Sequence, residues 1–362
     1  MKRLVKIILF ILPWWFGVCH AVPGKAVSFT VASYNVENLF DMNRDGTEYD
    51  DYAPYGPSGW TQSVMDIKFD NIARVLKDLD ADILALQEIE TGKALALLQQ
   101  GLNRMGMAYP YSAIADGRPT AVKCAVLSRY PIRSKEEIRA GHDQERNILK
   151  LTVDIDGALL ILYVNHWKSK NGPESRRITY AKALSDDIGR LNPNADYILT
   201  GDFNSDYNEY ETFKGIDRLN DTQGITGINH ILGTLADGRM VDESFLTTRK
   251  NGRYLYNLWM EVPEDKRWSV IFGGRKNTPD SILISAGLYD AEGVNYVDNS
   301  FHVFAPDYLF KDNRIYRWQR GGRGRGRHLG KGFSDHLPVV AEFTTQPFHF
   351  ADTGKHAIDL SN

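Results

Sequence analysis

Short apolar segments of strand-like composition recur along the chain, and each lies beside residues that bind metals or phosphate. They are residues 31–34 before Asn35, 83–87 before Glu88, 160–165 before His166, 198–201 before Asp202 and Asn204, and 337–342 after Asp335 and His336. In α/β sheets, ligands bind where the loops at strand ends converge. One such residue alone is more often a turn or cap residue, but five strand ends with compatible chemistry predict a single shared site.

Strand and helix patterns are interspersed along the whole chain. β-rich apolar runs predict strands at residues 27–34, 83–86, 124–127, 148–153, 159–164, 197–200, 281–284 and 339–343. Apolar residues at helical spacing predict helices at 62–79, 93–102 and 174–191, the last with Ser175 as a candidate cap. This order is typical of a layered α/β fold. No Pro- or Ser-rich linker divides the 362 residues, so we predict one domain at 22–345 and a tail at 346–362.

The first 21 residues have the three-part plan of a secretory signal. Three positive residues precede a nearly apolar stretch at 7–18, and Cys19-His20-Ala21 supplies small residues for cleavage. The stretch is shorter than the ~20 residues of a membrane-spanning helix, so we expect a secreted or periplasmic chain with no transmembrane helix once residues 1–21 are removed. The alternative is a lipoprotein acylated at Cys19, although Val18 is a poor residue before a lipid-bearing cysteine.

The charge balance does not favour a globally basic nucleic-acid binder. The net charge is −3, and removal of residues 1–21 takes away three positive charges and no negative ones. A polyanion must therefore be met by a local patch or by bound cations. Only Cys124 remains in the mature chain, so it forms no intramolecular disulfide, and its apolar neighbours predict a buried structural thiol.

The residues at the strand ends suit metal-assisted hydrolysis of a phosphate ester. Carboxylate and amide oxygens are hard ligands for Mg²⁺ or Mn²⁺, and no Cys or His cluster at zinc spacing is present. A phosphodiester repels hydroxide, so a cation must neutralise its charge. A histidine or aspartate must also accept a proton from the attacking water.

Six motifs together make the chain similar to one known family. They are Tyr34-Asn35-Val36-Glu37-Asn38, Leu86-Gln87-Glu88, Asn165-His166-Trp167-Lys168-Ser169-Lys170, Gly201-Asp202-Phe203-Asn204-Ser205, Asp280-Ser281-Ile282-Leu283 and Ser334-Asp335-His336-Leu337-Pro338. Their order and spacing, over residues 27–345, resemble the endonuclease/exonuclease/phosphatase superfamily with its deoxyribonuclease I-like fold.

This resemblance implies a fold and a set of roles. The fold is a four-layer sandwich of two packed mixed β-sheets flanked by helices. Three residues would bind the metal: Glu88, Asn35 and Asp335. Five would be catalytic: His336 as base or phosphate ligand, Asp280 to orient its imidazole, Asp202 to activate water, and Asn204 and His166 to hold phosphate oxygens. Whether Asp202 or His336 accepts the proton stays open, although an Asp280–His336 pair would favour His336.

A basic segment precedes the last motif and suggests how a nucleic acid is held. Residues 314–331 contain no acid and seven cations, namely Arg314, Arg317, Arg320, Arg323, Arg325, Arg327 and Lys331. A flexible Arg/Gly loop follows sugar-phosphate backbones, and Tyr316 and Trp318 would stack on bases. The alternative is a solvated loop. Lys168 and Lys170 would add charge near His166. DNA-repair relatives have a phosphate-contacting tyrosine where this chain has Ala121; Arg146 is a candidate substitute, and the alternative is that Arg146 is a surface arginine.

The acidic loop at residues 41–60 partly matches a calcium-binding loop. Asp41, Asn43, Asp45 and Gly46 fit its first half, but Tyr52 stands where the last ligand is required. We expect a solvated acidic loop, with a weak structural Ca²⁺ site as the alternative.

Three functions fit the sequence. The first is a secreted nuclease acting on DNA or RNA, with no protein partner. The second is a phosphatase or a sphingomyelinase-like phospholipase, which requires an exposed aromatic surface. Trp259, Trp268 and Phe272 are candidates, but no apolar hairpin is evident. The third is a non-catalytic binding protein, against which all the acidic and histidine positions are intact.

Overall fold

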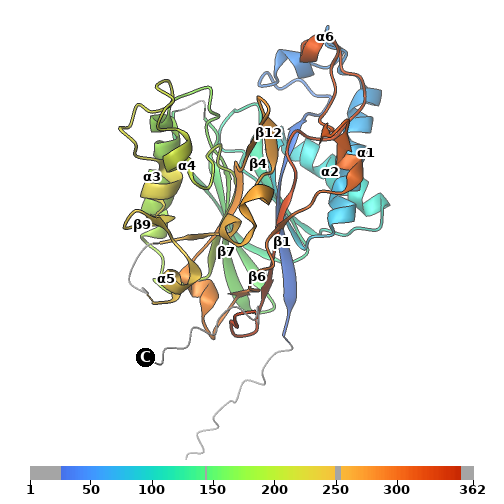
Figure 1. The fold of residues 1–362 in the computed structure, drawn as a ribbon. Coiled ribbons are helices and arrows are strands. Elements are labelled where there is room, and N and C mark those ends of the chain that lie inside the picture. The colour runs from blue at the N-terminus through green and yellow to red at the C-terminus, as the bar shows by residue number, and fades with distance from the viewer. Residues whose placement is uncertain (1–25, 143–144, 249–253, 352–362) are drawn as a thin grey trace, which may run out of the picture.

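Two mixed β-sheets form the centre of the computed structural model, which describes residues 26–142, 145–248 and 254–351 (Figure 1). The signal segment with Cys19, and the tail beyond residue 351, lie outside the described residues. The first sheet has the order β15-β19-β1-β2-β4-β3, with β16 also paired to β19, and the second has the order β11-β14-β8-β7-β6-β5. The strands of the first sheet are β1 (Ser28–Leu39), β2 (Ile83–Ile89), β3 (Tyr111–Ile114), β4 (Lys123–Ser128), β15 (Asn295–Tyr296), β16 (His302–Val303) and β19 (Val339–Thr344). Those of the second are β5 (Ile132–Ile138), β6 (Ile148–Ile155), β7 (Ala158–His166), β8 (Tyr197–Asp202), β11 (Tyr256–Asn257) and β14 (Asp280–Ile284).

Three long helices cover the outer faces of the sheets. Helices α1 (Gln62–Leu79) and α2 (Gly92–Arg104) pack on the first sheet, and α3 (Glu174–Ile188) packs on the second. The Thr61 hydroxyl caps α1 by accepting from the Val64 amide. Ser175 was predicted to cap α3, and this is wrong, because α3 begins after Pro173 and has no side-chain cap. The short helices are α4 (Glu209–Thr212), α5 (Glu243–Thr248) and α6 (Gly321–Gly324).

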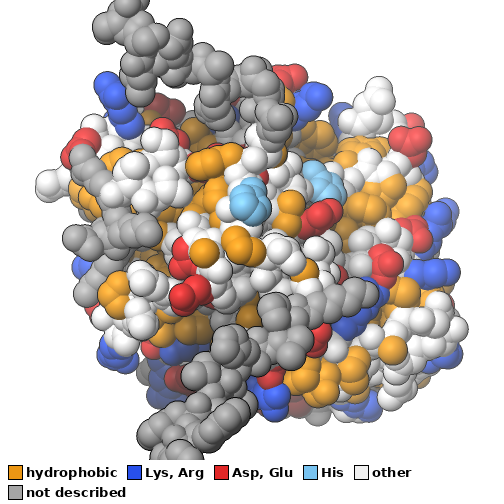
Figure 2. Space-filling view, turned by 90° about the horizontal axis from the view of Figure 1, so that it is seen from below, with side chains coloured by type: hydrophobic (Ala, Val, Ile, Leu, Met, Phe, Trp, Pro, Cys, Tyr) orange, Lys and Arg blue, Asp and Glu red, His pale blue; other side chains and the backbone are white. Residues whose placement is uncertain are grey.

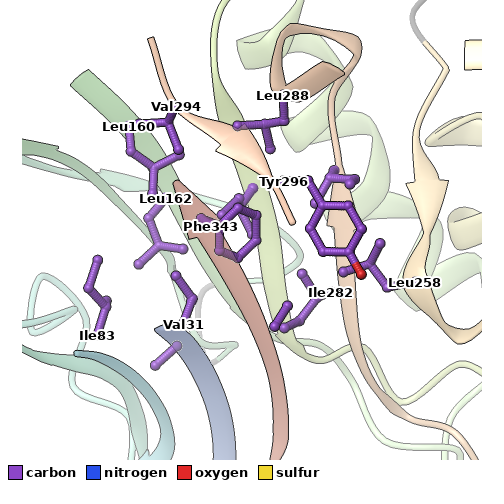
Figure 3. Close-up of a cluster of buried hydrophobic side chains, with 14 of the residues drawn as sticks. Val31, Ile83, Leu160, Leu162, Leu258, Ile282, Leu288, Val294, Tyr296 and Phe343 are labelled. Atoms are coloured by element: carbon purple, nitrogen blue, oxygen red, sulfur yellow. The ribbon is translucent and has the colours of Figure 1, made fainter. Parts of the chain in front are cut away.

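Alternation along the strands produces the four layers. Val31 faces the core between the sheets whereas Ala32 faces α1 and α2, and Ile198 and Leu199 divide in the same way between that core and α3. Figure 3 shows the inter-sheet core, in which Val31 and Ile83 of the first sheet approach Leu162 of the second. The predicted sandwich of two sheets flanked by helices is therefore confirmed.

Several short elements connect these layers. Two-stranded ribbons are formed by β9 (Leu235–Ala236) with β10 (Arg239–Met240), β12 (Val270–Phe272) with β13 (Arg275–Asn277), and β17 (Phe310–Lys311) with β18 (Arg314–Ile315). Among the described residues, no helix is both long and apolar enough to span a membrane. The first residues of the predicted tail pack on the domain, since Phe348 lies 4.5 Å from Tyr289 between ring centroids.

Strand directions bring the chemistry-bearing residues to one end of both sheets. β1 runs parallel to β2, and β7 runs parallel to β8, so their carboxyl ends coincide. β19 is antiparallel to β1, and β14 is antiparallel to β8, with Asp280 directly opposite Asp202. Residues that start these later strands therefore meet residues that end the earlier ones, near the β12 label in Figure 1.

Candidate active site

Asn35 joins the two sheets at this end. Its amide nitrogen donates to Glu88 Oε1 at 3.2 Å and to Asp202 Oδ2 at 3.1 Å. His166 lies against the same two carboxylates, with Nε2 at 3.7 Å from Glu88 Oε1 and 3.5 Å from Asp202 Oδ2. Four of the predicted site residues, from four different strands, therefore form one contact group.

Asp280 and His336 form a buried acid–imidazole pair. His336 Nδ1 lies 2.8 Å from Asp280 Oδ2, which also accepts from the Ser269 hydroxyl at 2.6 Å. With Nδ1 engaged, Nε2 faces Asp202 and Asp335, each with a carboxylate oxygen at 3.9 Å. Burial disfavours the imidazolium, but the negative charge of Asp280 outweighs it and raises the pKa of His336 well above its ordinary value.

Asp202 is buried among polar groups that orient its carboxylate. Oδ1 accepts from the Asn204 amide at 2.8 Å, and Oδ2 accepts from Asn35. Burial raises the pKa of Asp202 to about 7, with His336 opposing that rise and Asp280 reinforcing it. A carboxylate with a pKa near neutrality is suited to accept and release a proton at physiological pH.

The backbone is in an unfavourable region at several of these positions. Glu37, Asn38, Glu88 and Asn204 all have positive φ angles, between 47° and 68°. Non-glycine residues rarely adopt this conformation, and such strain concentrates at functional sites. Gly201, which precedes Asp202, has φ +132°, and a Cβ there would lie 2.1 Å from the Asn165 carbonyl oxygen. Only glycine fits at this position.

A buried tryptophan positions His166. Trp167 packs between Tyr180 and Phe203, and its indole donates to Asn165 Oδ1 at 3.0 Å. Burial, with Arg146 nearby, lowers the pKa of His166 well below its ordinary value, so the ring is neutral. Arg146 itself donates to the main-chain oxygens of His166 and Trp167 at 3.1 and 2.9 Å. The structure therefore has Arg146 bracing the strand end; its predicted substrate contact remains a prediction.

Three further charged residues adjoin the site. Glu37 and Lys68 were assigned no role from the sequence, and Arg317 was placed in the basic segment expected to hold a nucleic acid. Arg317 bridges Glu37 and Asp335, and the Asp335 contact is 3.2 Å long. Burial and the nearby Asp335 raise the pKa of Glu37 to about 7. Lys68, fully buried on α1, donates to the Phe333 carbonyl at 2.6 Å, and burial lowers its pKa to about 8. These side chains hold the segment that carries Asp335 and His336 against β1 and α1.

Comparison with known proteins identifies the chain's relatives. The model of the Endonuclease/Exonuclease/phosphatase family matches residues 30–240, which is more than half of the chain. The chain belongs to this family. A comparison with curated protein sequences found no match.

Solved structures agree with this family membership at the level of the fold. Humanized D. rerio TDP2, with 14 mutations, has a TM-score of 0.53 at 15% identity, covering 87% of this chain and 98% of that one. TDP2 from Caenorhabditis elegans has a TM-score of 0.51 at 16% identity, covering 88% and 74%. D. rerio TDP2 complexed with single strand DNA product has a TM-score of 0.51 at 13% identity, covering 87% and 98%. These likenesses show the fold, and the family model is what supports a hydrolase of the endonuclease/exonuclease/phosphatase family.

The residues of this family site fit a hard divalent cation. Asp202, Asp280 and Asp335 surround the His336 imidazole, and Glu88 lies against the neighbouring His166; such an excess of negative charge is relieved by a bound cation. Asp202, Asp280 and His336 lie within metal-ligating distance of one another, but the short Asp280–His336 contact marks them as a proton-handling group. Glu88, whose side chain is 19% exposed, is the better ligand. Asn35 turns its amide nitrogen toward Glu88, so in this structure it orients that carboxylate.

The predicted flexible Arg/Gly loop is instead folded. Arg320 forms a two-contact ion pair with Asp51 at 2.5 and 2.7 Å, and residues 320 and 328 form a β-bridge around α6. The prediction that Trp318 stacks on bases is wrong, because it is 3% exposed and its indole donates to His328. Tyr316 is half-buried against Phe333. This segment covers the loop after β1, at the α6 end of Figure 1.

The remaining residues predicted to bind substrate differ in their exposure and in whether an acidic residue already pairs with them. Arg325 and Arg327 are exposed, Lys168 is half-buried, and the side chain of Arg323 lies outside the described part. Lys170 is bound by Asp206 and Glu209 at 2.8 and 2.7 Å, so its charge is neutralised. Figure 2 shows the end opposite the site, where acidic and basic side chains are mixed without a basic field.

A cavity of about 410 Å³ opens beside His336. Val270, Phe272 and Pro279 supply apolar walls, and Asn204 and His336 lie at its inner side. The β12–β13 hairpin forms one wall, with Phe272 77% exposed near its tip. The hairpin thus presents one exposed aromatic side chain, whereas its second strand, Arg275-Lys276-Asn277, is polar. Trp259, one of the proposed membrane-contacting aromatics, is fully buried, and Trp268 is half-buried.

Cys124 is buried as expected, and burial raises the pKa of its thiol to about 12.

Proposed function

We propose that this chain is an exported, Mg²⁺-dependent nuclease that hydrolyses phosphodiester bonds in DNA or RNA. The observation that carries the proposal is the convergence of Asn35, Glu88, His166, Asp202 and the Asp280–His336 pair on one end of two sheets. The segment at residues 1–21, in which three positive residues precede an apolar stretch, supports export.

The protein side chains divide the reaction between them. Glu88 and Asp335 would hold the cation, which would neutralise phosphate charge. Asp202 accepts the proton of the attacking water, since its pKa lies near 7. His336, held as an imidazolium by Asp280, faces the scissile phosphate with Nε2. Neutral His166, which lies 3.5 Å from Asp202, and Asn204, whose side-chain amide donates to the Trp167 carbonyl at 3.1 Å, would contact phosphate oxygens. The raised pKa of His336 thus favours Asp202 as the base.

Two observations support a nucleic acid as the substrate. Arg325 and Arg327 are exposed and follow α6, which lies at the same end of the molecule as the site (Figure 1). There they would contact phosphates. In addition, a protein of the same fold has been solved with single strand DNA product.

One observation favours a second function. The exposed Phe272 on a hairpin beside the cavity is the aromatic surface that a phospholipase on this scaffold requires. An activity panel separates the two. Supercoiled plasmid, single-stranded DNA, RNA, sphingomyelin vesicles and inositol phosphates are each incubated with Mg²⁺ and with chelator, using the Glu88→Ala variant as the inactive control. Hydrolysis of nucleic acid by the wild type and not by Glu88→Ala supports the proposed nuclease activity. Hydrolysis of sphingomyelin alone among the substrates refutes it.

A further inference from the structure

A second group of carboxylates lies where the loop after β1 passes the end of β2. Oxygens of Asp45, Glu48 and Glu90 all lie within 4.8 Å of one another. Asp45 and Glu48 belong to the loop, whereas Glu90 follows β2 directly. None of the three belongs to the catalytic group described above.

Glu90 gives this group a feature that surface acids lack. Its side chain is fully buried; Oε2 accepts from the Asp41 amide at 2.6 Å, and Oε1 has no hydrogen-bond partner. The buried ammonium of Lys123 donates to the main-chain oxygens of Glu90 and Thr120 and not to this carboxylate. A buried carboxylate oxygen without a partner is strongly unfavourable. Its place beside two other carboxylates indicates that a cation completes the group.

The ligands differ from those of the calcium-loop pattern in the sequence. Asp41 is buried, accepting from the Thr91 hydroxyl at 2.7 Å and the Asn43 amide at 2.6 Å. The side-chain oxygen of Asn43 accepts from Lys93 at 2.7 Å. The first two positions of the pattern are therefore occupied by protein contacts. The interpretation of this stretch as a purely solvated loop is wrong for Asp41.

We propose that Asp45, Glu48 and Glu90 bind a structural calcium ion. Ca²⁺ accepts six to eight oxygens at about 2.3–2.6 Å in irregular geometry, so one ion spans oxygens up to about 4.8 Å apart. Mg²⁺ requires near-octahedral ligands at about 2.0–2.1 Å and keeps several waters. The ion would tie the loop that carries Tyr49 and Asp51 to the strand that carries Glu88. This site is independent of the proposed nuclease activity.

Calcium titration of the full chain tests the proposal directly. Chelator-treated protein carrying Glu88→Gln, which weakens the catalytic cation site, is titrated calorimetrically with Ca²⁺ alone. We expect one ion per chain, with Kd raised at least tenfold by Glu90→Gln or Glu48→Gln. Asp50→Asn, an exposed acid of the same loop, is the matched control and is expected to leave Kd unchanged. Equal binding in all four proteins would overturn the site.

Thermal unfolding supplies a second readout, the rise in Tm on adding Ca²⁺, which can be compared even when a variant differs from the parent in stability. In chelator, Glu90→Gln is expected to melt at or above the parent temperature, because a buried carboxyl group with no partner for Oε1 is replaced by a neutral amide of the same shape. In Ca²⁺ the parent gains several degrees, by mass action, and the variant gains none. Equal Ca²⁺ stabilisation of parent and variant would refute the site, and equal stabilisation of the parent by Mg²⁺ would refute the choice of calcium.

Discussion

Replacing Asp280 by asparagine tests the proposed roles of Asp202 and His336. The substitution keeps the shape of the side chain but removes the charge that holds His336 as an imidazolium across 2.8 Å. A buried hydrogen bond to a charged group contributes about 1.5–3 kcal/mol. At 1.36 kcal/mol per pKa unit, the pKa of His336 is expected to fall by about one to two units.

The direction in which the pH profile shifts depends on whether the reaction needs His336 protonated or neutral. If His336 acts as an imidazolium on the phosphate, activity is lost as pH rises through its pKa. Lowering that pKa therefore moves the alkaline limb of kcat/KM to lower pH by about one to two units. We therefore expect the loss of kcat/KM to be larger on the alkaline side of the profile than at pH 6.

The assay is a pH profile on a DNA substrate at saturating Mg²⁺. Ser269→Ala is the matched control, since it removes the 2.6 Å hydrogen bond to the same oxygen of Asp280 but leaves the charge; its shift is expected to stay under half a unit. An alkaline limb that stays in place while only the acid limb moves would refute the imidazolium role of His336. An unchanged profile would refute the pairing itself.

Three further predictions concern the metal, the substrate and the fold. Glu88→Gln is expected to lower Mg²⁺-dependent turnover by about 10³-fold or more at an unchanged circular dichroism spectrum, because the remaining ligands hold the cation poorly. Changing Arg325 and Arg327 to Ser is expected to raise KM for DNA and to reduce the slope of log binding constant against log salt concentration by about one to two. Arg320→Ser should instead lower Tm, because it breaks the ion pair with Asp51. Burial raises the pKa of Asp196 to about 7, above its unfolded value of about 3.9. Asp196 therefore contributes stability at low pH, and this contribution is lost as the pH rises to about 7. Over that pH range the Tm of Asp196→Asn should fall less than the Tm of the wild type.

The strand ends could be predicted because their signals are local. Residues 83–86 and 197–200 are continuous apolar runs, and such runs form buried strands in a sandwich. The polar residues that follow each run then lie where the strands end, on one side of the sheet. β5 escaped prediction because it is an edge strand, mostly exposed, with the sequence Ile-Arg-Ser-Lys-Glu-Glu-Ile. Charged side chains protect such edges and mask the alternating pattern.

The charged support around the site could not be predicted because its partners are far apart in sequence. Glu37 and Arg317 are 280 residues apart, and no spacing rule connects them. A partial signal existed, since Glu37 lies inside the motif that contains Asn35, and Arg317 belongs to the basic segment. Composition alone gave that segment a flexible character, but the aromatic side chains of Tyr52, Trp60 and Trp318 enclose His328 and give it a folded structure.

The catalytic geometry depends on how the two sheets pack, because the site is divided between them. Asn35 and Glu88 belong to the first sheet, and His166, Asp202 and Asp280 belong to the second. The Asn35–Asp202 hydrogen bond of 3.1 Å crosses the gap between the sheets directly. Since β-sheets pack about 10 Å apart through interdigitating side chains, the apolar core in Figure 3 sets the distance that this contact needs. Residues that never touch substrate thereby control whether the Glu88 cation site and the Asp202 carboxylate face the same phosphate.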